Sequence, residues 1–386
     1  MAADACFPAF GRFDADSFLR DYWQKRPLLI RNPWAGWRNP LEPDELAGLA
    51  CEDGVEARLV VHGADGWSLE HGPIPEDRFG ELGTDPWTLL VQAVDQHVPE
   101  VAALIEPFRF VPDWRIDDVM VSYASDGGGV GPHFDRYDVF LVQGLGRRRW
   151  RVGGPCDEAS ELLPHGQLRL LARLDPIDEW VLEPGDILYL PPGIAHDGIA
   201  VGDDCMTYSV GFRAPSRREL LAGWAEGEPD LPGEDERYED PDLVRQANPG
   251  EIAASALDRL YRLAGGAGER AEFARWFGEY ASTPKYPEID WRPEEPLEPG
   301  ELRALAADGV PLARNPASRF CFLREGSSIV LFADGVGTEC RDACAAFAER
   351  LCAETSLVLD PAAPEAVLDL VADLVNQGCL AFDEDG

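Results

Sequence analysis

The chain has 386 residues, which is enough for two or three domains of ordinary size. Apolar residues make up 45% and charged residues 27%, close to the globular average, so a wholly disordered or fibrous chain is excluded. The 71 acidic residues outnumber the 34 basic ones, for a formal charge of -37. Such a chain repels nucleic-acid backbones, and the charge suits either a basic protein partner or a solvated acidic surface.

The sequence shows no export or membrane-anchoring segment. Residues 1–12 lack a basic stretch followed by an apolar one, and no segment reaches the ~18 apolar residues that a membrane span requires. The nine cysteines include no CxxC pair, which argues against a disulfide framework and a zinc ribbon. We therefore expect a cytoplasmic protein with no membrane contact.

The first region, residues 1–212, carries most of the β-rich patterns. Short runs of β-branched and aromatic residues, separated by turn residues, predict strands at 118–123, 139–142, 149–152 and 186–190. Helical patterning at 14–22 and 43–50 precedes them. These patterns predict a closed or double-sheeted antiparallel β structure with helices over one side.

The second region, residues 213–290, is predicted to be helical. Ser216 and Glu219 form the S-x-x-E pattern of a capping box, which predicts a helix start. The acidic, proline-containing stretch 226–242 then predicts an exposed linker or loop. Beyond it, apolar residues recur at three- and four-residue intervals over 252–263 and 273–280, as in amphipathic helices. Such helices could pack on the β structure or pair with a second copy, and we favour self-association.

The third region, residues 291–386, mixes helices and strands. We expect helices at 299–307, around 340–351 and at 364–376, strands at 319–323 and 328–333, and a last strand near Cys379. This order is typical of a winged-helix unit. Its 7 basic and 18 acidic residues sum to a charge of -11, so we expect no direct DNA binding.

The most informative segment is 127–152, GGGVGPHFDRYDVFLVQGLGRRRWRV. In a strand, residues two apart face the same side, so His133 and Asp135 would point into the barrel and Phe134 away from it. Downstream, the pattern G-x5-P-x-G-x2-H ends at His196, and the rigid Pro-Pro-Gly turn before it would set the direction of this histidine. His196 can therefore supply a third ligand.

Two histidines and one carboxylate on one face of an octahedron leave three positions open, as in non-heme Fe(II) oxygenases. The open positions admit O2 and a chelating cosubstrate, which a closed four-ligand zinc site would exclude. His133 alone could be a hydrogen-bonded core residue. Joined to the second pattern, however, the H-x-D pair predicts an iron centre. Asp138 and Asp197 could orient the imidazoles or could be exposed loop charges.

The run Arg147 to Arg149 is a second sign of a binding site. Alternation in a strand sends Arg148 to one face and its two neighbours to the other. An arginine inside an apolar barrel is costly unless an anion meets it. Arg148 could bind the distal carboxylate of a dicarboxylate cosubstrate bidentately, while an outward cluster paired with surface carboxylates suits Arg147 and Arg149 better.

Several segments resemble the bacterial ribosomal oxygenase family. They are FLRDYWQKRPLLIR (18–31), DWRIDDVMVSYASDGGGVGPHFDRYDVFLVQGLGRRRWRVG (113–153), LEPGDILYLPPGIAHDG and YSVGFRAPS. The resemblance is specific over about residues 8–215 and only architectural beyond. It implies a mainly β plus α fold, a double-stranded β-helix of the jelly-roll, cupin/JmjC type, followed by a helical dimerisation region and a C-terminal winged helix. A homodimer is implied as well.

The resemblance also implies roles for the residues singled out above. His133, Asp135 and His196 match the iron ligands, and Arg148 matches the basic residue that holds the 2-oxoglutarate carboxylate. Family members are Fe(II)- and 2-oxoglutarate-dependent protein hydroxylases that consume O2. The bacterial ones are similar to arginyl 3-hydroxylases of a large-subunit ribosomal protein.

An arginine substrate implies a pocket for a guanidinium group. Asp117, Asp118, Tyr137 and Ser209 are the candidates to hold it, because carboxylates accept a guanidinium fork and an aromatic face can stack on it. Alternation along the strand would let only one of the two aspartates face inward.

We therefore expect a 2-oxoglutarate-dependent dioxygenase that hydroxylates a basic ribosomal protein. Three alternatives stay open: a JmjC-type demethylase of a methylated lysine or arginine, a non-catalytic 2-oxoglutarate-sensing binding protein, and a cupin enzyme for a small molecule. The demethylase needs the same iron centre but a cage for the methylated cation. The complete triad with Arg148 argues against the sensor, and a small-molecule cupin would not need Arg148.

Overall fold

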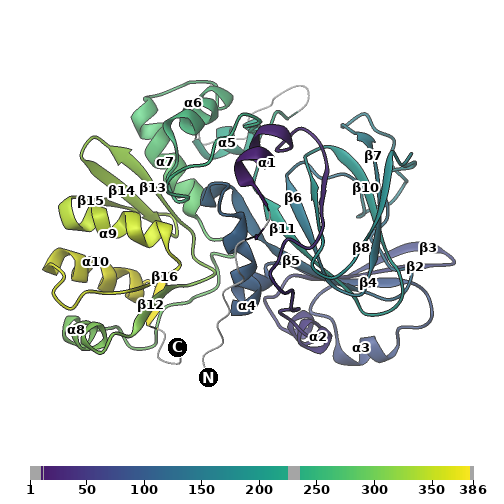
Figure 1. Cartoon of the computed structure of the whole chain (residues 1–386), viewed down its shortest axis with the longest axis horizontal. Coiled ribbons are helices and arrows are strands. Elements are labelled where there is room, and N and C mark those ends of the chain that lie inside the picture. The colour runs from purple at the N-terminus through teal and green to yellow at the C-terminus, as the bar shows by residue number, and fades with distance from the viewer. Residues whose placement is uncertain (1–9, 12, 225–234, 383–386) are drawn as a thin grey trace.

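The computed structural model describes residues 10–11, 13–224 and 235–382. Figure 1 shows a β-rich part on the right, the helices α5 to α7 at the top, and a mixed unit of helices and strands on the left. The β-rich part contains the predicted metal ligands, and the other two parts pack against it.

Two antiparallel sheets make up the β-rich part. The larger has eight strands in the order β1-β9-β6-β11-β5-β4-β2-β3, and the smaller has the order β10-β7-β8. The strands of the larger sheet are β1 (Leu28–Ile30), β2 (Ala57–Gly63), β3 (Gly66–His71), β4 (Trp87–Val91), β5 (Ile116–Ala124), β6 (Val139–Leu145), β9 (Ile187–Leu190) and β11 (Cys205–Phe212). Those of the smaller sheet are β7 (Arg148–Pro155), β8 (Asp178–Leu182) and β10 (Ile194–Ala200). The predicted double-sheeted antiparallel structure is thus confirmed. The predicted strands correspond to β5, β6, β7 and β9, whereas β1, β2, β3, β4, β8, β10 and β11 were not predicted individually.

The alternation of side chains along β6 separates two layers of core. Phe140 and Val142 pack with the N-terminal helices in the largest apolar cluster, whereas Val139 and Leu141 pack against the smaller sheet. The helices before and between these strands are α1 (Ala15–Asp21), α2 (Pro43–Cys51), α3 (Glu76–Gly80), α4 (Pro99–Ala102) and the 3-10 turns Val94–Gln96, Ala103–Phe108 and Asp113–Arg115. The larger sheet therefore has a helix-covered outer face and an inner face that is free to form a pocket.

The second region is helical, as predicted, with α5 (Arg217–Trp224), α6 (Ala254–Leu263) and α7 (Arg270–Ser282). The capping box forms: Ser216 N donates to Glu219 Oε2 (2.7 Å), and Glu219 N donates to Ser216 Oγ (3.1 Å). Buried residues of these helices share one apolar cluster with Trp114 of the β-rich part and Phe332 of the C-terminal unit. The helical region thus joins the other two parts.

The C-terminal unit contains two three-stranded sheets, β16-β12-β17 and β13-β14-β15, with three helices. Its elements are α8 (Pro299–Asp308), β12 (Pro311–Arg314), β13 (Phe320–Glu325), β14 (Ser328–Ala333), β15 (Val336–Cys340), α9 (Asp342–Ala353), β16 (Ser356–Val358), α10 (Glu365–Asn376) and β17 (Leu380–Phe382). All the elements predicted for this region are present, and β12, β15 and β16 are additional.

The expectation of an exposed linker or loop at 226–242 holds only in part for its described residues: the chain is irregular and Glu236, Glu239 and Asp242 are exposed, but two residues are buried. Residues 226–234 lie outside the described residues, but Tyr238 and Asp240 are only 4% and 3% exposed. Asp240 accepts hydrogen bonds from Arg115 Nη1 (2.5 Å) and from Trp23 Nε1 (2.9 Å). Its charge is used to neutralise a cation in the core, which the local composition could not indicate.

Arg115 is the centre of a buried polar network. Its guanidinium is fully buried and also pairs with Asp138 at 3.4 Å. Asp138 accepts further hydrogen bonds from Gln24 Nε2 (2.9 Å) and Tyr189 Oη (2.6 Å). Burial raises the pKa of Asp138 to about 6, against the opposing effects of Arg115 and these hydrogen bonds. The network joins the end of the first helix, the larger sheet and the segment around Asp240.

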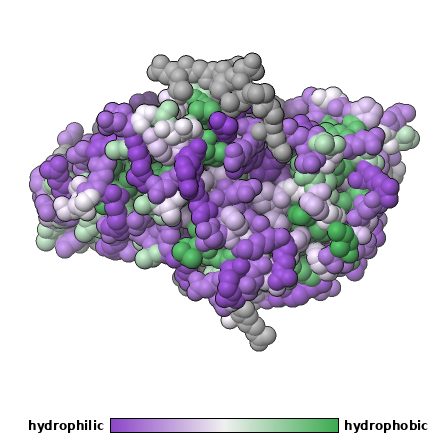
Figure 2. Space-filling view, turned by 90° about the horizontal axis from the view of Figure 1, so that it is seen from above, coloured by the Kyte–Doolittle hydropathy of each residue, from purple (hydrophilic) through white to green (hydrophobic). Residues whose placement is uncertain are grey.

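The surface is largely polar. In Figure 2 hydrophilic residues cover most of the described face seen from above, and the apolar areas are small and separate. The longest described helix, α7, has 13 residues, and no described helix is long and apolar enough to cross a membrane.

Replacing Arg115 by Met should destabilise the fold by about 3–5 kcal/mol, because it leaves two buried carboxylates without their cation. Urea denaturation followed by tryptophan fluorescence would measure the loss. The control is Arg292→Met, which breaks an exposed pair with Asp290 and should leave the free energy of unfolding unchanged. Equal stability of the two variants would contradict the role of the network.

Candidate metal centre and pocket

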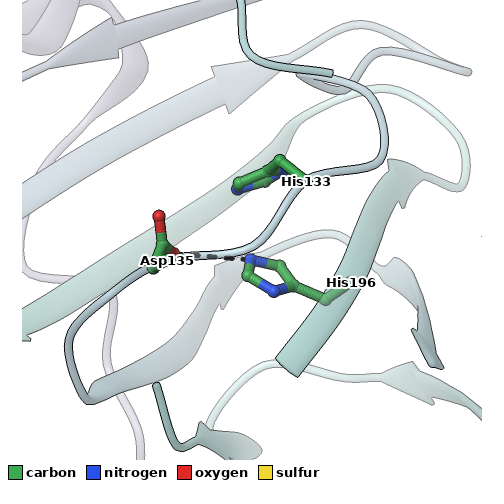
Figure 3. A group of neighbouring side chains, drawn as sticks. All are labelled: His133, Asp135 and His196. Carbon is green, nitrogen blue, oxygen red and sulfur yellow. Dashed lines mark ion pairs between the residues drawn. The ribbon is translucent and has the colours of Figure 1, made fainter. Parts of the chain in front are cut away.

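His133, Asp135 and His196 come together in the structure (Figure 3). One ligand atom from each lies within 4.8 Å of the others, and His196 Nε2 is 3.5 Å from Asp135 Oδ2. Among the described residues this is the one group of three or more histidine, cysteine or carboxylate side chains with such spacing. The prediction that these three side chains lie close together is therefore confirmed.

Backbone hydrogen bonds hold the two ligand-bearing segments together. His133 N donates to His196 O (2.9 Å), and His196 N donates to His133 O (2.8 Å), forming an isolated antiparallel bridge. Gly193 N donates to Asp135 O at 2.7 Å. The expectation of a regular strand at 133–135 is wrong, and Phe134, expected to point away, lines the same pocket. Strict alternation does not apply because the chain here is a loop with a single bridge.

The hydrogen bonds of the two rings leave their Nε2 atoms available for a metal. Nδ1 of His133 lies 2.8 Å from Gly131 O, and Nδ1 of His196 lies 2.9 Å from Ile194 O. A carbonyl oxygen only accepts, so each Nδ1 carries the hydrogen and each Nε2 presents its lone pair. Burial lowers the pKa of His196 to about 4, and the charge of His133 adds to this effect. At neutral pH His196 is therefore in its ligand form.

Neither suggestion for Asp138 and Asp197 is correct. Both are buried, so they are not exposed loop charges. Asp138 belongs to the Arg115 network and Asp197 pairs with Arg151, so neither orients a ligand ring. Backbone carbonyls have that role, which side-chain patterns in the sequence cannot reveal.

A cavity of about 570 Å³ lies beside the three ligands, a volume typical of small-molecule sites. Both sheets line it, and so do Glu219 of α5, Tyr280 of α7 and Arg237, which lies between these helices in the sequence. The helical region therefore contributes to the wall of the pocket, which was not predicted.

Arg148 lines this cavity and is 4% exposed. Its Nη1 donates a long hydrogen bond to Gly198 O (3.4 Å), while Nε and Nη2 are buried without a partner among the described residues. Trp150 Nε1 and Thr88 Oγ1, also in the lining, are likewise buried and unpartnered, and nothing in the sequence singled them out. A buried cation with unused donors is costly, so this end of the pocket fits an anionic group such as a carboxylate.

All four predicted substrate contacts, Asp117, Asp118, Tyr137 and Ser209, line the cavity. The expectation that only one aspartate faces inward is wrong. Ile116 pairs with Phe212 and Val119 with Val210, so a β-bulge sets both aspartates opposite the single residue Gly211. Both carboxylates consequently reach Lys285 Nζ, each at 2.9 Å.

Tyr137 and Ser209 both line the pocket but differ in exposure. Ser209, on β11, is 9% exposed, whereas Tyr137, in the loop before β6, is 42% exposed. The negative charge of Asp135, together with burial, raises the pKa of Tyr137 well above its ordinary value. The phenol is therefore protonated at physiological pH and can donate a hydrogen bond beside the metal ligands.

Comparison with known families assigns the class of protein. A JmjC domain matches residues 103–220 and a ROXA-like winged helix matches residues 263–381, while an AraC-like ligand binding domain matches 178–273 and overlaps both. The fold and the site thus define a JmjC-domain protein with a C-terminal winged helix.

The chain is 40% identical over 370 residues to the ribosomal protein uL16 3-hydroxylase of Escherichia coli (strain K12), covering 95% of this chain and 97% of that protein. A crystal structure of E. coli YcfD is 38% identical with a TM-score of 0.78, covering 96% of this chain and 99% of that one. A second, of the ribosomal oxygenase YcfD with cobalt and 2-oxoglutarate, has the same identity and coverage and a TM-score of 0.75. This chain belongs to the family of JmjC-domain ribosomal oxygenases.

Replacing Gly193 by Ala should weaken metal binding by roughly tenfold. Gly193 has φ +77, a Cβ there would lie 3.2 Å from Cys156 O, and its N–H holds the Asp135 backbone. Titration with Fe(II) under anaerobic conditions would measure the affinity.

The matched control for Gly193→Ala is Gly202→Ala. Gly202 has a similar φ of +81, but a Cβ there would meet no atom within 4 Å. Both variants carry backbone strain, and only Gly193→Ala should lose metal affinity. Equal metal affinities in the two would show that the Gly193 contact does not place Asp135.

Proposed function

We propose that this oxygenase is an Fe(II)- and 2-oxoglutarate-dependent hydroxylase of an arginine side chain in a basic ribosomal protein of the large subunit. The observation that carries the proposal is one pocket in which a His-Asp-His group lies near a buried arginine with unused donors. The E. coli relatives named above, one a ribosomal protein 3-hydroxylase and one crystallised with cobalt and 2-oxoglutarate, support it.

In this proposal His133, Asp135 and His196 hold Fe(II) and leave the remaining coordination positions to 2-oxoglutarate and O2. The bound iron supplies oxidation of a C–H bond coupled to conversion of 2-oxoglutarate into succinate and carbon dioxide. Arg148 binds the distal carboxylate of 2-oxoglutarate through its unused Nε and Nη2 donors. The protein's own contribution is to orient both substrates and to keep water away from the reacting atoms.

We assign the guanidinium of the substrate to Asp118 rather than Asp117. Donors from Gln92, Ala93 and Lys285 all reach Asp118 Oδ2, and no described residue donates to Oδ1. Oδ1 lies 3.8 Å from where a Cβ on the pocket-lining Gly211 would be, so it is placed to accept from a ligand in the pocket. Asp117 uses both of its oxygens internally. Tyr137 and Ser209 complete the proposed arginine site.

The charge of the chain suits this substrate. A protein with a net charge of -37 attracts a basic ribosomal protein at long range, which speeds encounter more than it tightens binding. We place the protein in the cytoplasm and propose that residues 213–290 form a homodimer interface. We retain the division into a catalytic part at 1–212, this helical part, and a winged-helix part at 291–386 that does not bind DNA directly.

Mass spectrometry of ribosomal proteins incubated with the purified chain, Fe(II) and 2-oxoglutarate tests the proposal. We expect a gain of one oxygen on an arginine of one large-subunit protein, and none with the His133→Ala variant. Loss of methyl groups instead would point to demethylation. Succinate release that no ribosomal protein stimulates, with no modified residue, would overturn the proposal.

Replacing Arg148 by Ala should raise the KM for 2-oxoglutarate at least tenfold, through loss of a charge-assisted hydrogen bond worth roughly 1.5–3 kcal/mol. Succinate production at varied 2-oxoglutarate would measure it. The matched control is Arg149→Ala, the next residue on β7, which is outside the pocket lining and should leave this KM unchanged. A KM that does not move in Arg148→Ala would place the cosubstrate elsewhere.

A further inference from the structure

Lys285, one of two lysines in the chain, does not line the pocket but contacts Asp117 and Asp118, which do. We propose that Lys285 is a positioning residue for substrate binding, which holds Asp118 with Oδ1 toward the pocket and makes the pocket depend on the helical region and the C-terminal unit. The inference rests on the proposed function, because it takes the occupant of the pocket to be a cationic side chain.

The contacts of Lys285 explain how it acts without touching the substrate. It lies just after α7, its side chain is 19% exposed, and Nζ is 2.9 Å from Asp117 Oδ2 and from Asp118 Oδ2. Both aspartates line the cavity, whereas Lys285 is not part of its lining. The ammonium group therefore supports the carboxylates on the side away from the pocket.

Three donors bind one carboxylate oxygen of Asp118, and no described residue donates to the other. Gln92 Nε2 (2.7 Å), Ala93 N (2.9 Å) and Lys285 Nζ converge on Oδ2. A carboxylate held in this way cannot rotate without breaking all three bonds, so the direction of Oδ1 is set in advance. Lys285 supplies the only formal charge among these donors.

Asp117 extends the contact to the C-terminal unit. Its Oδ1 accepts from Arg319 Nη2 (2.8 Å), and the same nitrogen donates to the Asp117 backbone carbonyl (3.1 Å). Arg319 immediately precedes β13. One lysine from the end of the helical region and one arginine from the C-terminal unit thus neutralise the two adjacent carboxylates of the bulge.

The ionisation of Asp118 depends on the opposing effects of its neighbours. Burial and the neighbouring charge of Asp117 raise the pKa of Asp118, while Lys285 opposes the rise. Burial and Asp118 also raise the pKa of the nearby Asp95 to about 7. Without Lys285, Asp118 would lose a hydrogen bond and its nearest cation, and it would be a poorer acceptor for a guanidinium.

The test compares Lys285→Met with the wild-type protein loaded with Fe(II) and 2-oxoglutarate, using a basic arginine-containing peptide of the ribosomal substrate. We expect the KM for the peptide to rise at least tenfold, with kcat at saturating peptide reduced less than threefold. The KM for 2-oxoglutarate and the metal affinity should not change, because neither site contacts Lys285.

Two further variants separate positioning from general damage. Lys285→Arg keeps a cation that can reach both carboxylates and should restore most of the peptide affinity. Tyr286→Phe, at the next residue, removes a hydrogen bond to Glu56 (3.0 Å) from the same segment and should leave all constants unchanged. If Lys285→Met does not fold, Lys285→Gln keeps a donor without the charge and should show the same rise in KM.

An unchanged peptide KM in Lys285→Met or Lys285→Gln, with normal wild-type turnover, would overturn this inference alone. A lower KM would overturn it too, because Lys285 would then be competing with the substrate cation for the carboxylates. A wild-type protein that neither binds nor hydroxylates basic peptides would instead overturn the proposed function, and the inference with it.

Discussion

The chemistry proposed for this protein depends on one pair of backbone hydrogen bonds. His133 and His196 exchange N–H to O bonds with each other, so the two candidate ligands are neighbours through their main chains before their rings are considered. The bond from Gly193 to the Asp135 carbonyl extends this pairing to the carboxylate. Segments far apart in the chain are thereby held in register by directional bonds, and the side chains follow with little freedom.

Two buried arginines of the β-rich part have different surroundings. Arg115 is surrounded by acceptors: Asp240, Asp138 and the carbonyl of Arg213. Arg148 is almost as buried but has two nitrogens with no partner among the described residues. Buried donors without a partner are costly, and because those of Arg148 lie in the lining of the pocket, an anionic ligand there could pair with them.

The three parts of the chain cooperate around the pocket. Residues of the helical region form part of its lining, and Lys285 and Arg319 connect the helical region and the C-terminal unit to the carboxylates of the bulge. Arg109 of the β-rich part adds bonds to the backbone carbonyls of Cys352 and Ala353. No described residue of the C-terminal unit lines the pocket itself, but Arg319 connects this unit to Asp117, which does.

The sequence by itself determined what depends on near neighbours: the strands at β5, β6, β7 and β9, the capping box of Ser216 and Glu219, and the residue types of the metal site. These follow from periodicity and short motifs. Only the tertiary structure decided that Asp240 is buried, that a bulge turns Asp117 and Asp118 to the same side, and that Lys285 meets them. Asp240 lies 217 residues from its partner Trp23, and Lys285 lies 167 residues from Asp118. The burial and charge state of such groups are set by partners that arrive only when the chain has folded, so no local pattern can encode them.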